Sequence, residues 1–134
     1  MRDFNSQELA NTAWAFATVG HKEERLFSTL AAAAEERMRD FNSQALANIA
    51  WAFATVGHKD ERFFSTLAAA AEQRMRDFNS QELANTAWAF ATVGHKDEQL
   101  FTALAVAAER RMRDFNSQEL ANTAWALPDS AVAR

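Results

Sequence analysis

Hydrophobic residues recur at helical spacing in two runs near the start of the chain, with a glycine between the runs. Leu9, Ala13 and Phe16 lie three or four residues apart, which places them on one face of an α-helix. The second run has apolar residues at positions 26, 27, 30, 31, 34 and 38, again at helical spacing. Gly20 supplies the positive φ angle that closes many helices. The pattern predicts a helix–turn–helix unit, with helix A at 6–19 and helix B at 22–39.

Polar residues at the expected helix starts support this unit. Asn5 and Glu8 are spaced as in a capping box, in which each side chain bonds the backbone amide of the other residue. Glu23 and Glu24 carry the negative charge that suits the positive amino end of helix B. The sequence therefore predicts where both helices begin.

The same unit is repeated along the chain. The heptapeptide MRDFNSQ begins at Met1, Met38, Met75 and Met112, so the period is 37 residues. A fixed period of this size is typical of stacked supersecondary units that share one continuous core. We therefore interpret 1–134 as a single array. Its repeats are 1–37, 38–74, 75–111 and a partial repeat at 112–127, followed by a non-repeat tail at 128–134.

This repetition predicts an all-α fold, an α-solenoid of seven helices in the order A-B-A-B-A-B-A. Pro128 cannot continue a helical hydrogen-bond ladder, so the last helix is expected to end near Leu127. The remaining helices A are expected at 43–56, at 80–93 and from Ser117, and the remaining helices B at 59–76 and 96–113.

The segment NSQELANTAWAFATVGHKDE at 79–98 resembles the octotricopeptide repeats and the similar heptatricopeptide repeats, whose units carry a Q-x-L-A-N-x-x-W-A core. The 37-residue period favours the heptatricopeptide form, and the resemblance covers about 1–127. It implies a helical-repeat RNA-binding protein of mitochondria or chloroplasts, acting in the processing, stability or translation of organellar transcripts. It also implies that helices A line a concave surface that faces single-stranded RNA.

The charge of the chain limits the kind of RNA binding to expect. The chain has 14 Lys and Arg against 18 Asp and Glu, a net charge of −4, whereas sequence-blind attachment to nucleic acid depends mainly on basic residues that neutralise phosphates. Cysteine is absent, which excludes disulfides and thiolate chemistry. No apolar run is long enough to cross a bilayer. We therefore expect specific contacts to RNA and no membrane partner.

Helix A carries the candidate base-contacting residues. On a helical wheel of the first copy, Gln7, Glu8 and Asn11 lie opposite the apolar side, and Thr12 lies at its border. The positions of Glu8 and Thr12 also differ between copies, as expected for a code that reads one base per repeat. Drift of two surface positions is the alternative. The candidates are Gln7, Glu8, Asn11, Thr12, Gln44, Ala45, Asn48, Ile49, Gln81, Glu82, Asn85 and Thr86.

Basic residues flank the predicted helices A. Arg39, Arg76 and Arg113 each precede a helix A, so stacking is expected to align them beside helix amino termini, which attract phosphate. We interpret these three residues as candidate phosphate contacts. Neighbouring carboxylates such as Asp40 leave an alternative, a rim of local ion pairs. A second basic ladder follows the helices A, at Lys22, Lys59 and Lys96.

Two aromatic ladders recur once per repeat. We interpret the tryptophans, at positions 14, 51, 88 and 125, as packing between repeats, with base stacking as the alternative. We interpret His21, His58 and His95 as turn residues, because helices that pack about 10 Å apart hold them too far from one another to share a metal. No metal site or cofactor is expected.

Catalysis has little support in the sequence. There is no Gly-rich phosphate loop, and near-identical copies supply no unique constellation for an active site. We therefore expect no enzymatic activity. The alternative to RNA binding is a protein-interaction or self-assembling scaffold, because apolar residues near the ends of the array are expected to be exposed, namely Trp14, Trp125 and Leu127.

Overall fold

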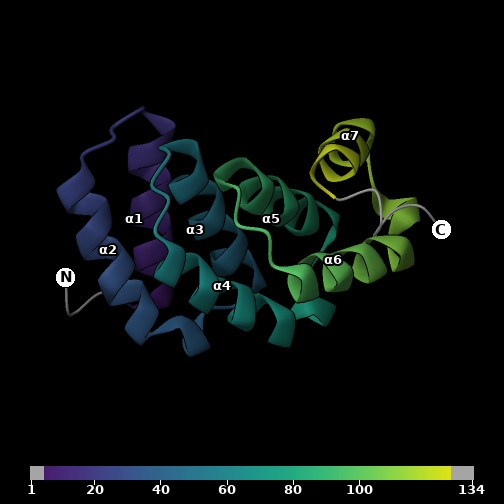
Figure 1. Cartoon of the computed structure of the whole chain (residues 1–134), viewed down its shortest axis with the longest axis horizontal. Coiled ribbons are helices and arrows are strands. Elements are labelled where there is room, and N and C mark those ends of the chain that lie inside the picture. Colours follow the sequence, from purple (N-terminus) through teal and green to yellow (C-terminus); the bar gives the residue numbers. More distant parts are fainter. Residues whose placement is uncertain (1–4, 128–134) are drawn as a thin grey trace.

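Helix pairs stack along the chain in the computed structural model, which describes residues 5–127. Layer A consists of α1 (Ser6–Thr18), α3 (Ser43–Thr55), α5 (Ser80–Val93) and α7 (Ser117–Ala126), and layer B consists of α2 (Glu24–Glu36), α4 (Glu61–Gln73) and α6 (Glu98–Arg110). Figure 1 shows the two layers side by side along the stack. No strand occurs within residues 5–127, and the predicted all-α solenoid is confirmed. None of the described helices is both long enough and apolar enough to span a membrane.

Local sequence signals set the ends of helices A. An asparagine side chain accepts a hydrogen bond at 2.8 Å from the backbone amide three residues later, at Asn5, Asn42, Asn79 and Asn116. After α1 the chain turns at Gly20, whose φ of 77° lies in the left-handed region that glycine adopts without strain. The bounds predicted for helices A are confirmed to within one residue at each end.

Helices B are shorter than predicted. α4 begins at Glu61, because the Asp60 carboxylate caps it by accepting from the Phe63 amide at 3.0 Å. Each helix B ends before a separate 3-10 turn. These turns are η1 (Met38–Asp40), η2 (Met75–Asp77) and η3 (Met112–Asp114). The predictions of continuous helices at 22–39, 59–76 and 96–113 are therefore wrong at both ends.

Hydrogen bonds between repeats join the first two 3-10 turns to later residues. The Arg74 guanidinium donates to the Arg39 carbonyl of the preceding turn at 2.9 Å. Arg111 repeats this bond one unit later, to the Arg76 carbonyl at 3.1 Å. The last carbonyls of a helical segment have no partner within that segment. These two bonds satisfy such carbonyls and connect neighbouring repeats.

Helices A pack against one another much more closely than helices B do. Alanine permits this approach, because its side chain is a single methyl group. Ala10 and Ala13 of α1, and Ala45 and Ala52 of α3, are at most 1% exposed. Layer A is therefore the shorter side of the stack, as expected for the concave side of a curved array.

A chain of phenylalanine rings joins the two layers. Phe53 of α3 stacks on Phe63 of α4 with ring centroids 4.2 Å apart, and it meets Phe27 of α2 edge-on at 5.1 Å. Phe64 of α4 meets Phe90 of α5 edge-on at 5.2 Å. All five rings are at most 1% exposed. The core is thus continuous from one repeat to the next.

Candidate nucleic-acid interface

One side of layer A presents the same three side chains in every repeat. Gln, Asn and Trp occupy positions that are four and then three residues apart, so they lie above one another on each helix. All of them are exposed or half-buried. We call this surface the A-face stripe, and it consists of Gln7, Asn11, Trp14, Gln44, Asn48, Trp51, Gln81, Asn85, Trp88, Gln118, Asn122 and Trp125.

The polar part of the A-face stripe is made of neutral amides. In α1 the Gln7 amide nitrogen donates to the Asn11 side-chain oxygen at 3.3 Å. Each amide group offers two donor hydrogens and an acceptor oxygen, so these residues keep further groups for a ligand. Asn and Gln pair with base edges through this combination of donor and acceptor. The stripe contains no Lys or Arg, so any phosphate contact has to come from its borders.

The tryptophans give the A-face stripe its apolar surface. Trp51 and Trp88 pack against the core with part of each ring and are otherwise open, while Trp14 is 45% and Trp125 64% exposed. Trp14 and Trp51 lie with ring centroids 6.3 Å apart, within the range of interacting aromatic pairs. The interpretation that they pack between repeats is thus confirmed only for part of each ring. Trp14 lies seven residues, or two helical turns, after Gln7, so this spacing alone indicates that Trp14 shares a side of the helix with Gln7.

Three predicted base-reading residues are instead buried between helices A. Ile49 and Thr86, which occupy the position of Thr12 in the next two repeats, are 0% and 2% exposed, and Ala45 is 1% exposed. The side of α3 and α5 that carries them packs against the preceding helix A. The prediction that Ala45, Ile49 and Thr86 contact RNA is therefore wrong, because no base can reach them.

The glutamates at the Glu8 position have a structural role. The Asn5 amide donates to the Glu8 carboxylate at 3.0 Å, which completes a capping box. The Asn79 amide makes the same bond to Glu82. These two carboxylates are engaged in capping α1 and α5. Among the predicted base contacts, those that remain open are the Gln and Asn of each repeat and the half-buried Thr12.

Replacing Thr86 by valine is expected to stabilise the fold by about 1 kcal/mol. The Thr86 hydroxyl is buried and has no hydrogen-bond partner, and valine keeps its shape while removing the unsatisfied group. Ile49, at the equivalent position, shows that an apolar side chain fits there. Urea unfolding of both proteins measures the change. Ile49→Thr is the matched reverse variant and is expected to destabilise; a loss of stability in Thr86→Val would contradict this account.

Exposed arginines border the A-face stripe at the amino ends of helices A. Arg39, Arg76 and Arg113 lie in η1, η2 and η3 and are all exposed. Asp40 in η1 is exposed as well, so each of these turns carries both signs of charge. The three arginines each precede a helix A by a few residues, and Arg76 also lines a cavity between α4 and α6; their contact with phosphate stays a prediction.

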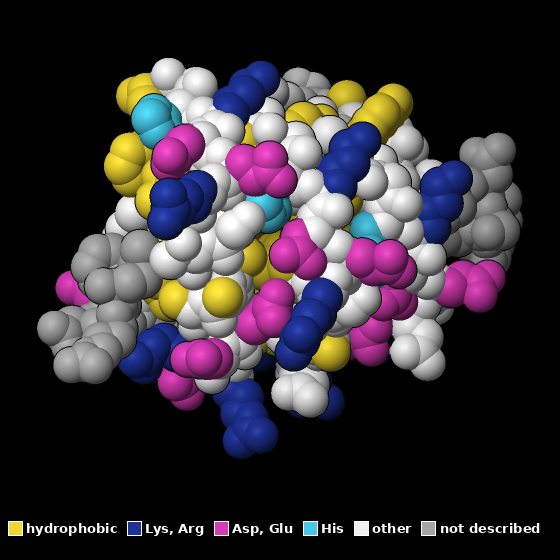
Figure 2. Space-filling model, turned by 60° about the vertical axis from the view of Figure 1, so that its left-hand side comes forward, with side chains coloured by type: hydrophobic (Ala, Val, Ile, Leu, Met, Phe, Trp, Pro, Cys, Tyr) yellow, Lys and Arg dark blue, Asp and Glu magenta, His cyan; other side chains and the backbone are white. Residues whose placement is uncertain are grey.

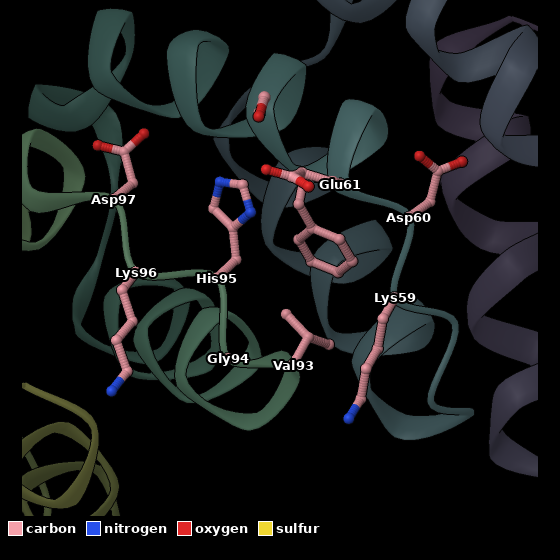
Figure 3. Close-up of a pocket in the computed structure, with 10 residues that line it drawn as sticks. Lys59, Asp60, Glu61, Val93, Gly94, His95, Lys96 and Asp97 are labelled. Carbon is pink, nitrogen blue, oxygen red and sulfur yellow. The ribbon is translucent and has the colours of Figure 1, made fainter.

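The lysines at the opposite end lie in a surface of alternating charge. Figure 2 shows this face, where basic and acidic side chains are interspersed around the three histidines. Lys59 and Lys96 line a cavity of about 500 Å³ between successive turns. Figure 3 shows their amino groups on one side of it and the carboxylates of Asp60, Glu61 and Asp97 on the other. Such mixed charge gives this rim little preference for an anion.

The histidines are packed against phenylalanines beside the turns. His58 lies 5.3 Å from Phe53 and 6.2 Å from Phe27, measured between ring centroids. His95 lies 5.7 Å from Phe90. The interpretation of these histidines as turn residues is confirmed. Within residues 5–127, no three His, Asp or Glu side chains lie close enough together to hold a metal ion.

Apolar side chains are exposed on the last described helix. Leu120 of α7 is 41% exposed, as expected for an end of the array. Leu127 is only 7% exposed, so the prediction that it is open is wrong. The backbone amide of Leu127 bonds the Thr123 carbonyl at 3.0 Å, which holds it at the end of the helix. Pro128 lies outside the described residues.

The match to a known family spans nearly the whole array. The family model described as RNA-editing substrate-binding complex 6 protein matches residues 1–132. The chain belongs to this family. No curated protein is significantly similar to the chain. The RNA-editing substrate-binding complex 6 family and the helix-pair stack together identify a helical-repeat protein of an RNA-associated family.

Proposed function

We propose that this family member binds single-stranded RNA along the A-face stripe, as a non-enzymatic module of an RNA-editing substrate-binding assembly. The observation that carries the proposal is the recurrence of Gln, Asn and Trp on the open side of four successive helices A. Each repeat then offers one aromatic surface for stacking and two amides for base edges. Single-stranded RNA has regularly spaced bases, so it can contact each repeat of such a periodic, uncharged surface in the same way.

Phosphate contacts in this proposal come from Arg39, Arg76 and Arg113. Their guanidinium groups neutralise phosphates at one border of the stripe, while the net charge of −4 limits attachment elsewhere. Because every repeat presents the same side chains, the stripe cannot assign a different base to each repeat. Any sequence preference then comes from the bases that the repeated amides favour along the bound strand. The resemblance to octotricopeptide and heptatricopeptide repeats supports a second part of the proposal. In it, the protein acts on transcripts in mitochondria or chloroplasts.

Binding to a pool of short single-stranded RNAs tests this proposal. With three phosphates neutralised, the logarithm of the association constant is expected to fall with the logarithm of salt concentration with a slope of about −2. Asn48→Ala combined with Asn85→Ala is expected to weaken binding about tenfold or more, because base-edge hydrogen bonds are removed. Gln99→Ala removes an exposed amide from α6 and serves as the matched control. Absence of binding at low salt, or equal effects of both changes, would refute the proposal and favour a protein scaffold.

A further inference from the structure

A second open surface lies on layer B, between α4 and α6. We call it the α4–α6 groove, a cavity of about 750 Å³ whose lining is Glu72, Gln73, Met75, Arg76, Ala103, Val106, Ala107, Arg110, Arg111 and Asp114. Its floor is aliphatic, with Val106 44% exposed and Met75 half-buried. It contains no aromatic side chain, in contrast to the A-face stripe.

This groove is where the third helix B departs from the repeat. Ala103, Val106 and Arg110 replace Thr66, Ala69 and Gln73, the residues 37 positions earlier. These are three of the six positions at which α6 differs from α4; they are spaced three and four residues apart, and all three line the groove. The other three changes in α6, at Gln99, Leu100 and Thr102, lie outside the groove lining. Within the groove, the changes enlarge the apolar floor and add one basic residue at its edge.

The charge of the groove is also reversed relative to the equivalent surface between α2 and α4. The α4–α6 groove has three arginines against two carboxylates, Glu72 and Asp114. The equivalent positions one repeat earlier have two arginines against three carboxylates, namely Arg39, Arg74, Glu35, Glu36 and Asp77. Arg62 adds a third arginine beside the earlier surface, in an ion pair with Glu35 at 3.4 Å, and Gln99 replaces it in α6, so the difference in charge comes from the lining residues alone. The α4–α6 groove therefore combines aliphatic surface with a positive rim.

We propose that the α4–α6 groove binds an acidic amphipathic helix of a protein partner. A helix with an aliphatic stripe fits between two helices through side chains that are three and four residues apart. Met75 adapts its shape to such side chains, and carboxylates flanking the stripe pair with Arg76 and Arg110. An aliphatic floor without aromatic rings gives bases nothing to stack on, so a peptide is favoured over RNA. No lining residue of the groove belongs to the A-face stripe, although Arg76 is also one of the proposed phosphate contacts. The inference rests on the groove and does not depend on the proposed RNA binding.

A short fluorescein-labelled helical peptide, with leucines at helical spacing and glutamates at the other positions, is the probe for this groove. Fluorescence anisotropy with the full chain is expected to show saturable binding, and a scrambled peptide of the same composition is expected to bind at least about tenfold more weakly. Val106→Asp and Arg110→Glu are each expected to weaken binding of the ordered peptide about tenfold or more. Both side chains are exposed, so the fold tolerates the changes.

Matched controls separate the groove from general charge effects. Ala69→Asp makes the same kind of change one repeat earlier, and Arg39→Glu makes the same charge change outside the groove. Both are expected to leave peptide binding within about twofold, as is Trp88→Ala in the A-face stripe. Equal binding of the scrambled peptide, equal effects of groove and control variants, or no saturable binding would overturn the inference. Oligouridylate that displaces the peptide and is equally sensitive to Arg110→Glu would identify an RNA surface instead.

Discussion

Replacing Trp51 and Trp88 together by alanine is expected to weaken RNA binding at least about 30-fold. Both rings lie at the middle of the A-face stripe and are half-buried, so each offers one surface to a base while it packs on the core with another part. Stacking of one base on an aromatic side chain contributes about 1–3 kcal/mol, and the double variant removes two such contacts. Fluorescence anisotropy with labelled single-stranded RNA measures the change.

The same variant loses packing as well as stacking, so a second pair of substitutions is required. Trp51→Phe with Trp88→Phe retains an aromatic face at each position and is expected to recover most of the affinity. Thermal unfolding by circular dichroism shows whether the alanine variant is folded at the assay temperature. If the folded alanine variant binds RNA as tightly as the parent chain, the tryptophans are only core residues and the stripe is not an RNA surface.

Phe53→Ala is expected to lower the free energy of unfolding by about 3–5 kcal/mol, the usual cost of removing a fully buried phenylalanine. Phe53 is 0% exposed and contacts Phe27, Phe63 and His58, with ring centroids between 4.2 and 5.3 Å. The substitution therefore leaves a cavity where three helices meet. Urea unfolding followed by circular dichroism measures the loss.

Phe16→Ala is a matched control for this prediction, because Phe16 occupies the same position in the first repeat. Phe16 is half-buried, and it has a ring contact to His21 at 5.2 Å. Its removal is expected to cost about half as much as removal of Phe53 or less, since the cost depends on how well the site can collapse. Equal losses for both variants would show that the continuous phenylalanine core does not determine stability.

Helix positions could be predicted from the sequence because their signals are local. Asn5 and Gly20 specify the start and the end of α1 through their own hydrogen bond and backbone angle. The end of helix B has no such signal, because Arg37 follows α2 where a glycine follows α1. Met38 continues the apolar spacing beyond Glu36, so the pattern predicted a helix longer than the observed one.

The candidate site was predicted only in part, for a related reason. A helical wheel shows which residues share a side of helix A, and it correctly grouped Gln7 with Asn11. It does not show the direction from which the next helix A approaches. Alanine occurs on nearly all sides of these helices, so polarity did not mark the buried side, and Ile49 and Thr86 were wrongly placed in solvent.

The sequence predicted that the tryptophans pack between repeats, because a bulky apolar residue at a fixed repeat position usually fills a core. Trp51 does pack on the core in part. Its remaining exposure follows from the short alanine side chains beside it, which let neighbouring helices A approach closely but leave the large ring projecting beyond them. Only the spacing of Trp51 from Gln44 and Asn48, on one side of the helix, indicated this in advance.

Photo-crosslinking of a bound single-stranded RNA, with the crosslinked residues located by mass spectrometry, tests the central claim most directly. We predict crosslinks at the stripe residues of α3 and α5, namely Asn48, Trp51, Asn85 and Trp88, and fewer crosslinks when Trp51 and Trp88 are replaced by alanine. Crosslinks confined to layer B, in α4 or α6, would contradict the claim that this protein binds RNA through its A-face stripe.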